Sequence, residues 1–466
     1  MAKEAAVLGT TIDSGASDWQ IFQQDKTGRG EIRVSGRWGF GQWPAWKKFT
    51  AQVRLVSEDT GAAVTAELDW QDALLKKNGT WTAALKNIPA GGLYRLETRL
   101  HDYNAWGGFM GDCRHFLGVG DIWIITGQSN SAGYGREPVY DPPQLGVHVF
   151  NNAMRWSLCT QPANETTDTA HMVNREGYPQ HGPWMAWAKI VSRSLGYPIG
   201  LIQVSLGGSP LSMWNPTEPG DSGLYDIMVQ AANATGGARG VLWYQGCSDA
   251  GPTTCKTYGK RFIAAVKAWR KALKNPDLHV LTIQLNCVIA DPQDEADRGW
   301  SIIRETQRVV PKQLAGVTVV PTLDQPLSDG IHNSAHGNLL MAQRAAATAL
   351  GAVYGKAIAW QAPEPATARK AQAGKAIDIR FANVTGQLTT VDGRASIKPF
   401  VVEDAQGNVP VEGVAYIKRD TIRLKLGRKL ADKAVVHGGF GMNPPTVPHD
   451  QPRMLPILAF YGLKVK

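Results

Sequence analysis

The chain has 466 residues, of which 43% are hydrophobic, and a formal net charge of +9. This length predicts about two to three domains, and the apolar content is sufficient for every part to fold. The basic residues are scattered, which argues against a nucleic-acid partner, and there is no apolar run of about 18 residues to span a membrane.

The N-terminal segment MAKEAAVLGTTIDSG contains no apolar signal core. We therefore expect a soluble protein that is cytoplasmic, or secreted or periplasmic if a leader has been removed. Five cysteines form no disulfide framework. Cys247 and Cys255 are close enough in sequence to pair across a loop, and two free thiols are an equally good interpretation.

Residues 1–118 have the pattern of a β-sandwich module. Apolar residues alternate with polar ones at Ile32 and Val34 and again at Val53 and Leu55. Turn sequences such as EDTG, NGT and PAGG separate these runs. Short alternating strands at regular spacing are typical of a sandwich of two sheets.

Residues 119–362 have the pattern of an α/β domain. Short apolar runs alternate with segments whose apolar residues recur at helical spacing. Buried strands that alternate with amphipathic helices predict a parallel sheet covered by helices on both faces. The expected strands are DIWIITGQ, IGLIQVSLGG, GVLWYQG, LHVLTIQLN and GVTVVPTLD, and the expected helices are 184–195, 224–232, 258–273, 302–309 and 337–350.

Residues 363–466 return to a β pattern. Ile377, Ile379 and Phe381 alternate with polar residues and predict a strand of a second β-sandwich-like module. The apolar segment MLPILAF near the C-terminus is expected to pack back on the central domain. The predicted fold class is therefore α/β, with a β module on each side of the central domain.

Polar residues follow the first and last expected strands of the central domain. Ser129 comes directly after the first strand, and Asp329 and His332 follow the last. The carboxyl ends of parallel strands meet at one edge of a sheet, where ligands bind. A neutral serine needs a base, and a carboxylate three residues before the histidine can hold its far ring nitrogen. This pattern predicts a catalytic triad of Ser129, His332 and Asp329, and leaves His336 to a structural role.

Three groups are predicted to form an oxyanion hole, namely the backbone N–H of Ser129, that of Gly208 and the side-chain amide of Gln245. The glycine pair at residues 207–208 also fits a plain turn at a strand end. Gln245 also fits a buried amide whose hydrogen bonds are satisfied inside the protein.

Aromatic and amide side chains of the same region are predicted to bind substrate. Trp184 and Trp214 offer flat faces for a sugar ring, and Gln128 and Asn130 flank the serine. The two tryptophans, like Tyr134, fit a hydrophobic core equally well. No metal-ligand spacing links the histidines, so we expect no metal and no other cofactor.

The segments GQSNS, GLIQVSLGGSPLSMW, VLWYQGCSD, RETQ and SDGIH resemble, in this order, the conserved blocks of the SGNH (GDSL-like) hydrolases. They are most similar to the sialate O-acetylesterase and carbohydrate acetylesterase branch, over roughly residues 119–350. The resemblance implies a three-layer α/β/α domain. It also implies metal-independent hydrolysis of an O-acetyl ester on a carbohydrate through an acyl-serine.

One position departs from the family pattern. Cys247 stands where the family has a glutamate in Gln-Gly-Glu-Ser, so a charge-assisted contact is lost unless a bridge to Cys255 replaces it. The acetylated sugar stays open among sialic acid, xylan and pectic glycans. The alternative function is a non-catalytic carbohydrate-binding protein on a hydrolase scaffold.

Overall fold

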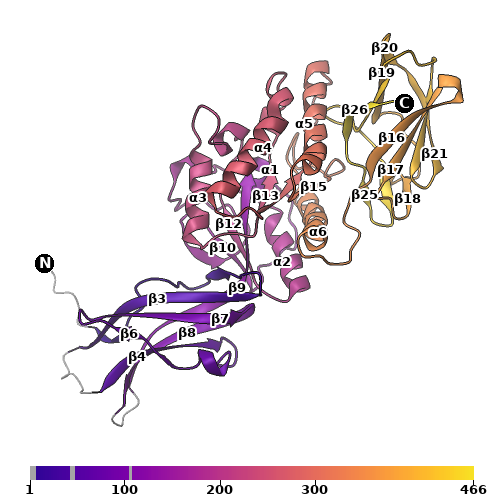
Figure 1. Ribbon diagram of the computed structural model, residues 1–466. Helices are drawn as coiled ribbons and strands as arrows, with labels where there is room; N and C mark the ends of the chain where they lie inside the picture. Colours follow the sequence, from indigo (N-terminus) through magenta and orange to yellow (C-terminus); the bar gives the residue numbers. More distant parts are fainter. Residues whose placement is uncertain (1–6, 42–47, 104–107) are drawn as a thin grey trace.

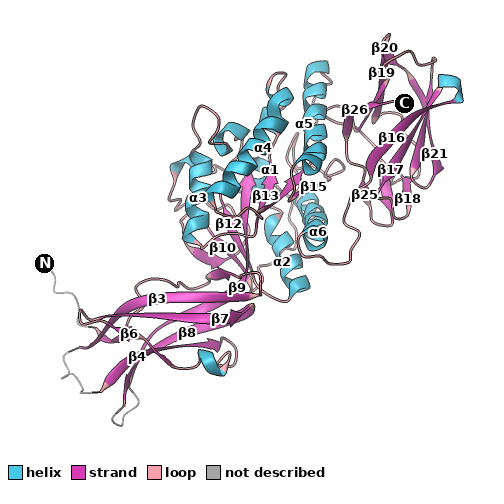
Figure 2. Cartoon of the chain, viewed as in Figure 1, coloured by secondary structure: helices cyan, strands magenta, loops and turns pink. Residues whose placement is uncertain are grey.

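Three hydrophobic cores follow one another along the chain, of which the computed structural model describes residues 7–41, 48–103 and 108–466. An all-β part is followed by a central α/β part and a second all-β part (Figure 1). Figure 2 shows that the long helices belong to the central part. Within the described ranges, no helix is both long and apolar enough to cross a membrane.

The N-terminal part consists of two sheets that share one core. Ile32 of β3 lies opposite Leu85 of β7, and Leu55 of β4 lies opposite Leu96 of β8. All four side chains are fully buried, because alternate residues of a strand point to the same face. The elements are β1 (Leu8–Thr10), β2 (Ile21–Gln23), β3 (Arg29–Phe40), β4 (Phe49–Ser57), the 3-10 helix Ala66–Leu68, β5 (Gln71–Asp72), β6 (Leu74–Leu75), β7 (Thr80–Pro89) and β8 (Gly91–Asp102).

A single strand, β9 (Phe109–Gly127), passes from the N-terminal part into the central part (Figure 1). Its first half pairs with β8 and contributes Leu117 and Val119 to the N-terminal core. Its second half contributes residues 122–125 to the central core. The boundary predicted between residues 118 and 119 therefore lies inside a continuous strand, with no turn between the two cores.

The central sheet has the order β11-β10-β12-β9-β13-β14-β15. Every neighbouring pair from β10 to β15 is parallel, and β11 pairs with β10 as an antiparallel edge strand. The strands of this sheet that follow β9 in the chain are β10 (Val147–Phe150), β11 (Trp156–Leu158), β12 (Ile199–Gln203), β13 (Gly240–Tyr244), β14 (His279–Ile283) and β15 (Val317–Val320).

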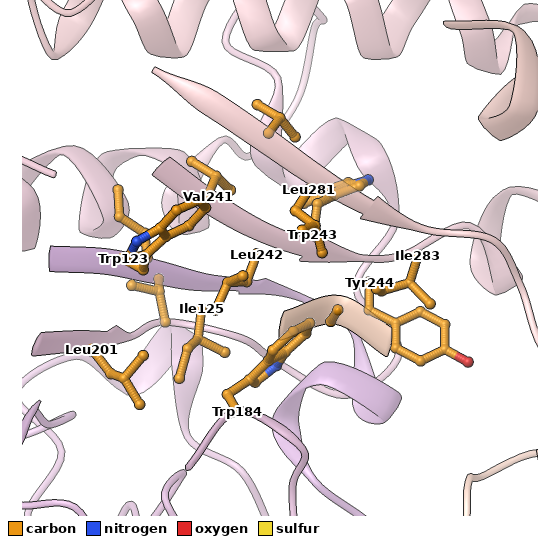
Figure 3. Close-up of a cluster of buried hydrophobic side chains, with 14 of the residues drawn as sticks. Trp123, Ile125, Trp184, Leu201, Val241, Leu242, Trp243, Tyr244, Leu281 and Ile283 are labelled. Carbon is orange, nitrogen blue, oxygen red and sulfur yellow. The ribbon is translucent and has the colours of Figure 1, made fainter. Parts of the chain in front are cut away.

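Helices pack on this sheet in two groups. Helix α2 contacts α6, and α4 contacts α3 and α5. Trp187 of α2 packs against Trp123 of β9, whereas Trp269 of α4 packs against Trp243 of β13. Figure 3 shows Trp123 and Trp243 in the core of this part. The helices are α1 (Ser129–Ala132), α2 (Trp184–Leu195), α3 (Gly223–Ala234), α4 (Thr254–Ala272), α5 (Asp294–Gln313) and α6 (Ala335–Ala352), with 3-10 turns at Met172–Asn174, Leu211–Trp214 and Cys247–Asp249.

Strands β10 and β11 have no counterpart among the elements expected from sequence. Strand β10 has four residues, and His148 interrupts its apolar run. The side chain of His148 is fully buried, and its Nδ1 lies 2.7 Å from the carbonyl oxygen of Trp19. Burial lowers the pKa of His148 to about 4. A neutral, hydrogen-bonded histidine is therefore part of the core, which a polarity pattern does not reveal.

The C-terminal part surrounds a core of its own, in which Ile379 of β17 lies opposite Ile422 of β22. Its sheets have the orders β16-β17-β22-β21, β20-β19-β23-β26 and β18-β24-β25. The elements are β16 (Glu364–Ala371), the 3-10 turn Gln372–Gly374, β17 (Ala376–Ala382), β18 (Gln387–Thr389), β19 (Phe400–Asp404), β20 (Gly407–Val409), β21 (Val411–Lys418), β22 (Thr421–Leu426), β23 (Val435–Gly438), β24 (His449–Gln451), β25 (Leu455–Pro456) and β26 (Phe460–Lys464).

Buried hydrogen bonds join the C-terminal part to the central part. Gln284 donates to the carbonyl oxygen of Ala459 at 3.0 Å and accepts from its N–H at 2.9 Å. The expected packing of MLPILAF on the central part is thus confirmed. Arg304 of α5 is fully buried and donates to backbone carbonyls on both sides of this interface, namely those of Leu285, Asn286, Gly439, Gly441 and Met442.

We expect Arg304→Met to destabilise the protein strongly. The methionine fills part of the space but leaves buried carbonyls without donors, which costs about 3 kcal/mol or more. The matched control is Arg155→Met, because Arg155 pairs with Asp168 at the exposed surface and such pairs contribute about 0.5 kcal/mol. Thermal unfolding of both variants checks this. Equal unfolding temperatures would show that Arg304 does not hold the interface.

Candidate active site

Ser129 occupies a tight turn between β9 and the single-turn helix α1. Gly127, the last residue of β9, has a φ of 109°, and a Cβ there would lie 2.3 Å from the carbonyl oxygen of Tyr244. Only glycine fits this close approach. The turn places Ser129 at the first position of α1, beyond the carboxyl end of the sheet. The serine residue as a whole is 7% exposed.

The structure brings Ser129, His332 and Asp329 together. His332 Nε2 lies 2.9 Å from Ser129 Oγ, and His332 Nδ1 lies 2.8 Å from Asp329 Oδ2. Asp329 Oδ1 accepts the backbone N–H groups of Ile331 and His332, which closes the turn. Ser334 then caps α6 by accepting the N–H of Gly337. His332 is thereby fixed in a short segment between a carboxylate-closed turn and a helix start.

The environment of Asp329 keeps its side chain ionised. Burial acts to raise the pKa of Asp329, but hydrogen bonds from the His332 ring and from two backbone N–H groups outweigh it and lower the pKa to about 2. Arg136 adds an ion pair at 3.0 Å from an exposed position. The charged carboxylate can hold the proton on His332 Nδ1, which leaves Nε2 free to accept a proton from Ser129.

Asn130 and Gln128 make hydrogen bonds that hold the site together from inside, and their role in substrate binding stays a prediction. Asn130 is 2% exposed, accepts the N–H of Asn333 at 2.8 Å and donates to the carbonyl of Ile331 at 3.2 Å. These bonds tie the serine turn to the histidine segment. Gln128 is 4% exposed, and its Oε1 accepts the N–H of Gly246 at 3.1 Å, which ties β9 to the end of β13.

Two of the three expected oxyanion donors are available. Gly208 has a φ of +71°, and open space surrounds the position of a Cβ. No described residue accepts the backbone N–H of Ser129 or that of Gly208. The N–H of Leu206 donates to the carbonyl of Gly127 at 3.0 Å, so the turn that carries Gly208 is held beside the serine turn. Both backbone groups are therefore free to bind an oxyanion near Ser129.

The third expected donor, the amide of Gln245, makes hydrogen bonds inside the protein. Gln245 is fully buried, and its Nε2 donates to Asp249 at 2.7 Å and to the carbonyl of Ser209 at 3.2 Å. Its Oε1 accepts from the Tyr258 hydroxyl at 3.0 Å. An amide nitrogen has two hydrogens, and both are engaged. With both hydrogens engaged inside the protein, Gln245 matches the alternative of a buried amide, and its oxyanion role stays a prediction.

The tryptophans expected to face the sugar lie in the core. Trp184 is 2% exposed and donates to Ser131 Oγ at 2.9 Å, and it packs among the buried residues of Figure 3. Trp214 is fully buried and donates to Ser209 Oγ at 3.1 Å. Their burial matches the alternative of a hydrophobic core, and their role in substrate binding stays a prediction. Tyr134, in contrast, is half-buried and stacks on the ring of His332.

Cys247 and Cys255 are not bonded to each other. The Cys255 thiol instead faces the carbonyl of Pro252 at 3.8 Å. The bridge interpretation is therefore wrong, and the departure at Cys247 has no covalent replacement. Within the described ranges, no group of three or more His, Cys, Asp or Glu side chains is placed to hold a metal ion.

A family model described as carbohydrate esterase, sialic acid-specific acetylesterase matches residues 119–351. The chain belongs to this family. The matched region contains Ser129, Gly208, Asp329 and His332. Family membership identifies the chain as a carboxylic ester hydrolase that acts on acetylated carbohydrates, within the SGNH-like superfamily.

Two curated relatives and one solved structure are similar to this esterase. A protein of Arabidopsis thaliana named as a probable carbohydrate esterase is 29% identical over 235 residues, which are 45% of this chain and 83% of that protein. Human sialate O-acetylesterase is 23% identical over 318 residues, 58% of this chain and 54% of the human protein. The crystal structure of a carbohydrate acetylesterase from Xanthomonas citri has a TM-score of 0.69 at 21% identity, covering 97% of this chain and 99% of that one, and shows a shared fold.

All five thiols of the esterase should be free in the folded protein. Denaturation without reductant, followed by alkylation, should add five alkyl groups by mass spectrometry. A bridge between Cys247 and Cys255 would leave three. Because no disulfide supports the loop beside Gln245, we also expect activity to be the same with and without dithiothreitol.

Proposed function

We propose that Ser129 is the nucleophile, His332 the general base and acid, and Asp329 the orienting carboxylate of this carbohydrate O-acetylesterase. The observation that carries the proposal is the continuous hydrogen-bonded series from Ser129 Oγ to His332 Nε2 and from His332 Nδ1 to Asp329, at 2.9 and 2.8 Å. Nucleophile, base and orienting group are each within reach of the next, as acyl transfer requires.

In the first half of the reaction, His332 Nε2 takes the proton of the Ser129 hydroxyl while Oγ attacks the acetyl carbonyl carbon. The N–H groups of Ser129 and Gly208 stabilise the oxyanion of the tetrahedral intermediate. One such donor typically contributes about 3 kcal/mol of transition-state stabilisation. His332 then gives its proton to the departing sugar oxygen, which leaves acetyl-Ser129 and a free sugar hydroxyl.

In the second half, a water molecule gives a proton to His332 Nε2 and attacks the acetyl-serine. The same two N–H groups stabilise the second oxyanion. The bond from Ser129 Oγ to the acyl carbon breaks, Oγ takes the proton back from His332, and acetate leaves. No step needs a metal or another cofactor.

We also infer that residues 119–362 form a three-layer α/β/α SGNH domain, which lies in the chain between β-sandwich-like modules at 1–118 and 363–466. The parallel pairing from β10 to β15 and the two groups of helices support this inference.

The sugar that carries the acetyl group can be identified by acetate release. The name of the human relative makes O-acetylated sialic acid one substrate to test, beside acetylated xylan and pectin. Substrates that bind well but release no acetate would instead support a carbohydrate-binding protein on a hydrolase scaffold. Each reaction is run with and without EDTA, and equal rates are expected.

Ser129→Ala should abolish ester hydrolysis while the unfolding temperature stays close to that of the native chain. The serine hydroxyl is the attacking atom, and its loss removes little buried surface. The matched control is His336→Ala, because His336 lies exposed on α6 and is expected to leave turnover unchanged. The measurement is hydrolysis of a chromogenic acetyl ester. Full activity in Ser129→Ala would exclude this nucleophile.

Asp329→Asn should lower turnover by up to about ten-thousandfold, because the amide favours the wrong tautomer of His332. We expect a smaller loss than in His332→Ala. The pKa of Asp329 is about 2, so its carboxylate is charged at every assay pH above about 4. Protonation of Asp329 therefore does not account for a fall in rate above this pH.

Removal of the Asp329 charge disfavours protonated His332, so the acidic limb of the Asp329→Asn profile should move to lower pH. The dependence of kcat/KM on pH measures this shift. An acidic limb at the native position would mean that Asp329 does not act on His332.

A further inference from the structure

The ring of Tyr134 covers one face of the His332 imidazole. The two ring centroids are 4.4 Å apart, and the planes differ by 26°. Tyr134 is half-buried and lies in the loop that follows α1. The base of the proposed triad is therefore bounded on one face by an aromatic ring, in addition to its hydrogen bonds to Ser129 and Asp329.

The hydroxyl of Tyr134 connects this ring to the oxyanion turn. It donates to Glu176 Oε1 at 2.6 Å, and Glu176 Oε2 accepts the N–H of Gly207 at 2.7 Å. Gly207 directly precedes Gly208, whose N–H is one of the proposed oxyanion donors. One buried carboxylate, 7% exposed, thus holds both the tyrosine that covers the base and the turn that carries the donor.

These three groups are in close contact. A Cβ at Gly207 would lie 2.9 Å from the Tyr134 hydroxyl and 3.1 Å from Glu176 Oε2, so a side chain at Gly207 would force them apart. The segment that carries Glu176 is itself anchored, because Thr166 Oγ1 donates to the carbonyl of Glu176 at 2.8 Å and Asn174 donates to Asn152 at 2.9 Å. Glu176 is therefore a rigid anchor for Tyr134 and Gly207.

We propose that Tyr134 and Glu176 are positioning residues that hold the His332 ring and the Gly208 oxyanion turn in one fixed arrangement. The inference rests on the proposed function, because it requires His332 to be the base and the Gly208 N–H to be an oxyanion donor. Tyr134 prevents His332 from rotating away from Ser129, and its ring face stabilises the imidazolium that forms when His332 takes the serine proton. Glu176 fixes the direction of the Gly208 N–H through Gly207.

The charged groups around His332 are compatible with the positioning role of Tyr134 and Glu176. Burial and the adjacent Glu176 raise the pKa of Tyr134, so its hydroxyl remains a donor throughout the working range. Asp329 and, behind it, Arg136 face the other ring nitrogen of His332. Glu137 lies behind the same segment, where it accepts from Ser328 and from the N–H of Ala335.

The first test compares Tyr134→Phe with Tyr134→Leu. Phenylalanine keeps the ring on His332, so kcat should fall less than about tenfold. Leucine removes the ring, and kcat should fall by roughly tenfold to a hundredfold with KM within about twofold of the native value. The matched control is Tyr140→Leu, since Tyr140 is 91% exposed, and its kcat should stay native.

The second test uses Glu176→Gln, which keeps the shape and removes the charge. We expect a lower kcat and an acidic limb of the pH profile that moves to lower pH by a few tenths of a unit, because a negative charge near His332 is lost. The double variant with Tyr134→Phe should lose little more than Glu176→Gln alone, since both substitutions act on the same hydrogen bond. If Tyr134→Leu fails to fold, these two variants decide the question.

Different variants test the triad and the positioning role of Tyr134 and Glu176. Activity retained in Ser129→Ala would overturn the triad itself. An inactive Ser129→Ala together with native kcat, KM and pH profile in Tyr134→Leu and Glu176→Gln would overturn the positioning role alone. A lower unfolding temperature with unchanged kcat and pH profile would show a purely structural role and would also overturn it.

Discussion

The hydrogen bond between Ser129 and His332 joins residues that are 203 positions apart in the chain. Their strands, β9 and β15, are separated in the sheet by β13 and β14, so the segment after β15 has to return across two strands to reach the serine. Asn286, just beyond β14, supports it on the way by donating to the carbonyl of Ile331 at 2.9 Å and to Asn333 at 2.7 Å. Asn286 and Asn130 thus both support this contact from inside the protein.

Buried amide side chains supply most of that support. Each amide offers two hydrogens and an acceptor oxygen, so one side chain can connect two backbone segments. Asn130 connects the serine turn to the histidine segment, Gln128 connects β9 to the segment after β13, and Gln245 is held by Asp249 and Tyr258. A polar residue beside the proposed nucleophile can face the substrate or bond inside the protein, and each of these almost completely buried amides makes the internal bonds.

Periodicity and turn residues were sufficient to predict the order of the three parts and every α-helix longer than one turn, although α5 is longer than expected. The meeting of Ser129, Asp329 and His332 could be predicted because all three follow buried strands, whose carboxyl ends meet. The orientation of Trp184 and Gln245 could not, because the choice between core and cleft depends on partners such as Ser131 and Asp249 that are remote in sequence. Tyr134 was noticed in the sequence, but its position over His332 depends on Glu176, which no motif marks.

The C-terminal part helps to support the segment that carries His332. The N–H of Val288 donates to the carbonyl of Met442 at 3.0 Å, and the N–H of the next residue, Ile289, donates to the carbonyl of Gly330 at 2.7 Å. The segment after β14 is thus bonded on one side to the C-terminal part and on the other to the turn that carries Asp329 and His332. Arg304 reinforces the same segment by donating to the carbonyl of Asn286 at 2.6 Å. Because backbone hydrogen bonds of this kind fix position more than they add net stability, the C-terminal part constrains where His332 can lie.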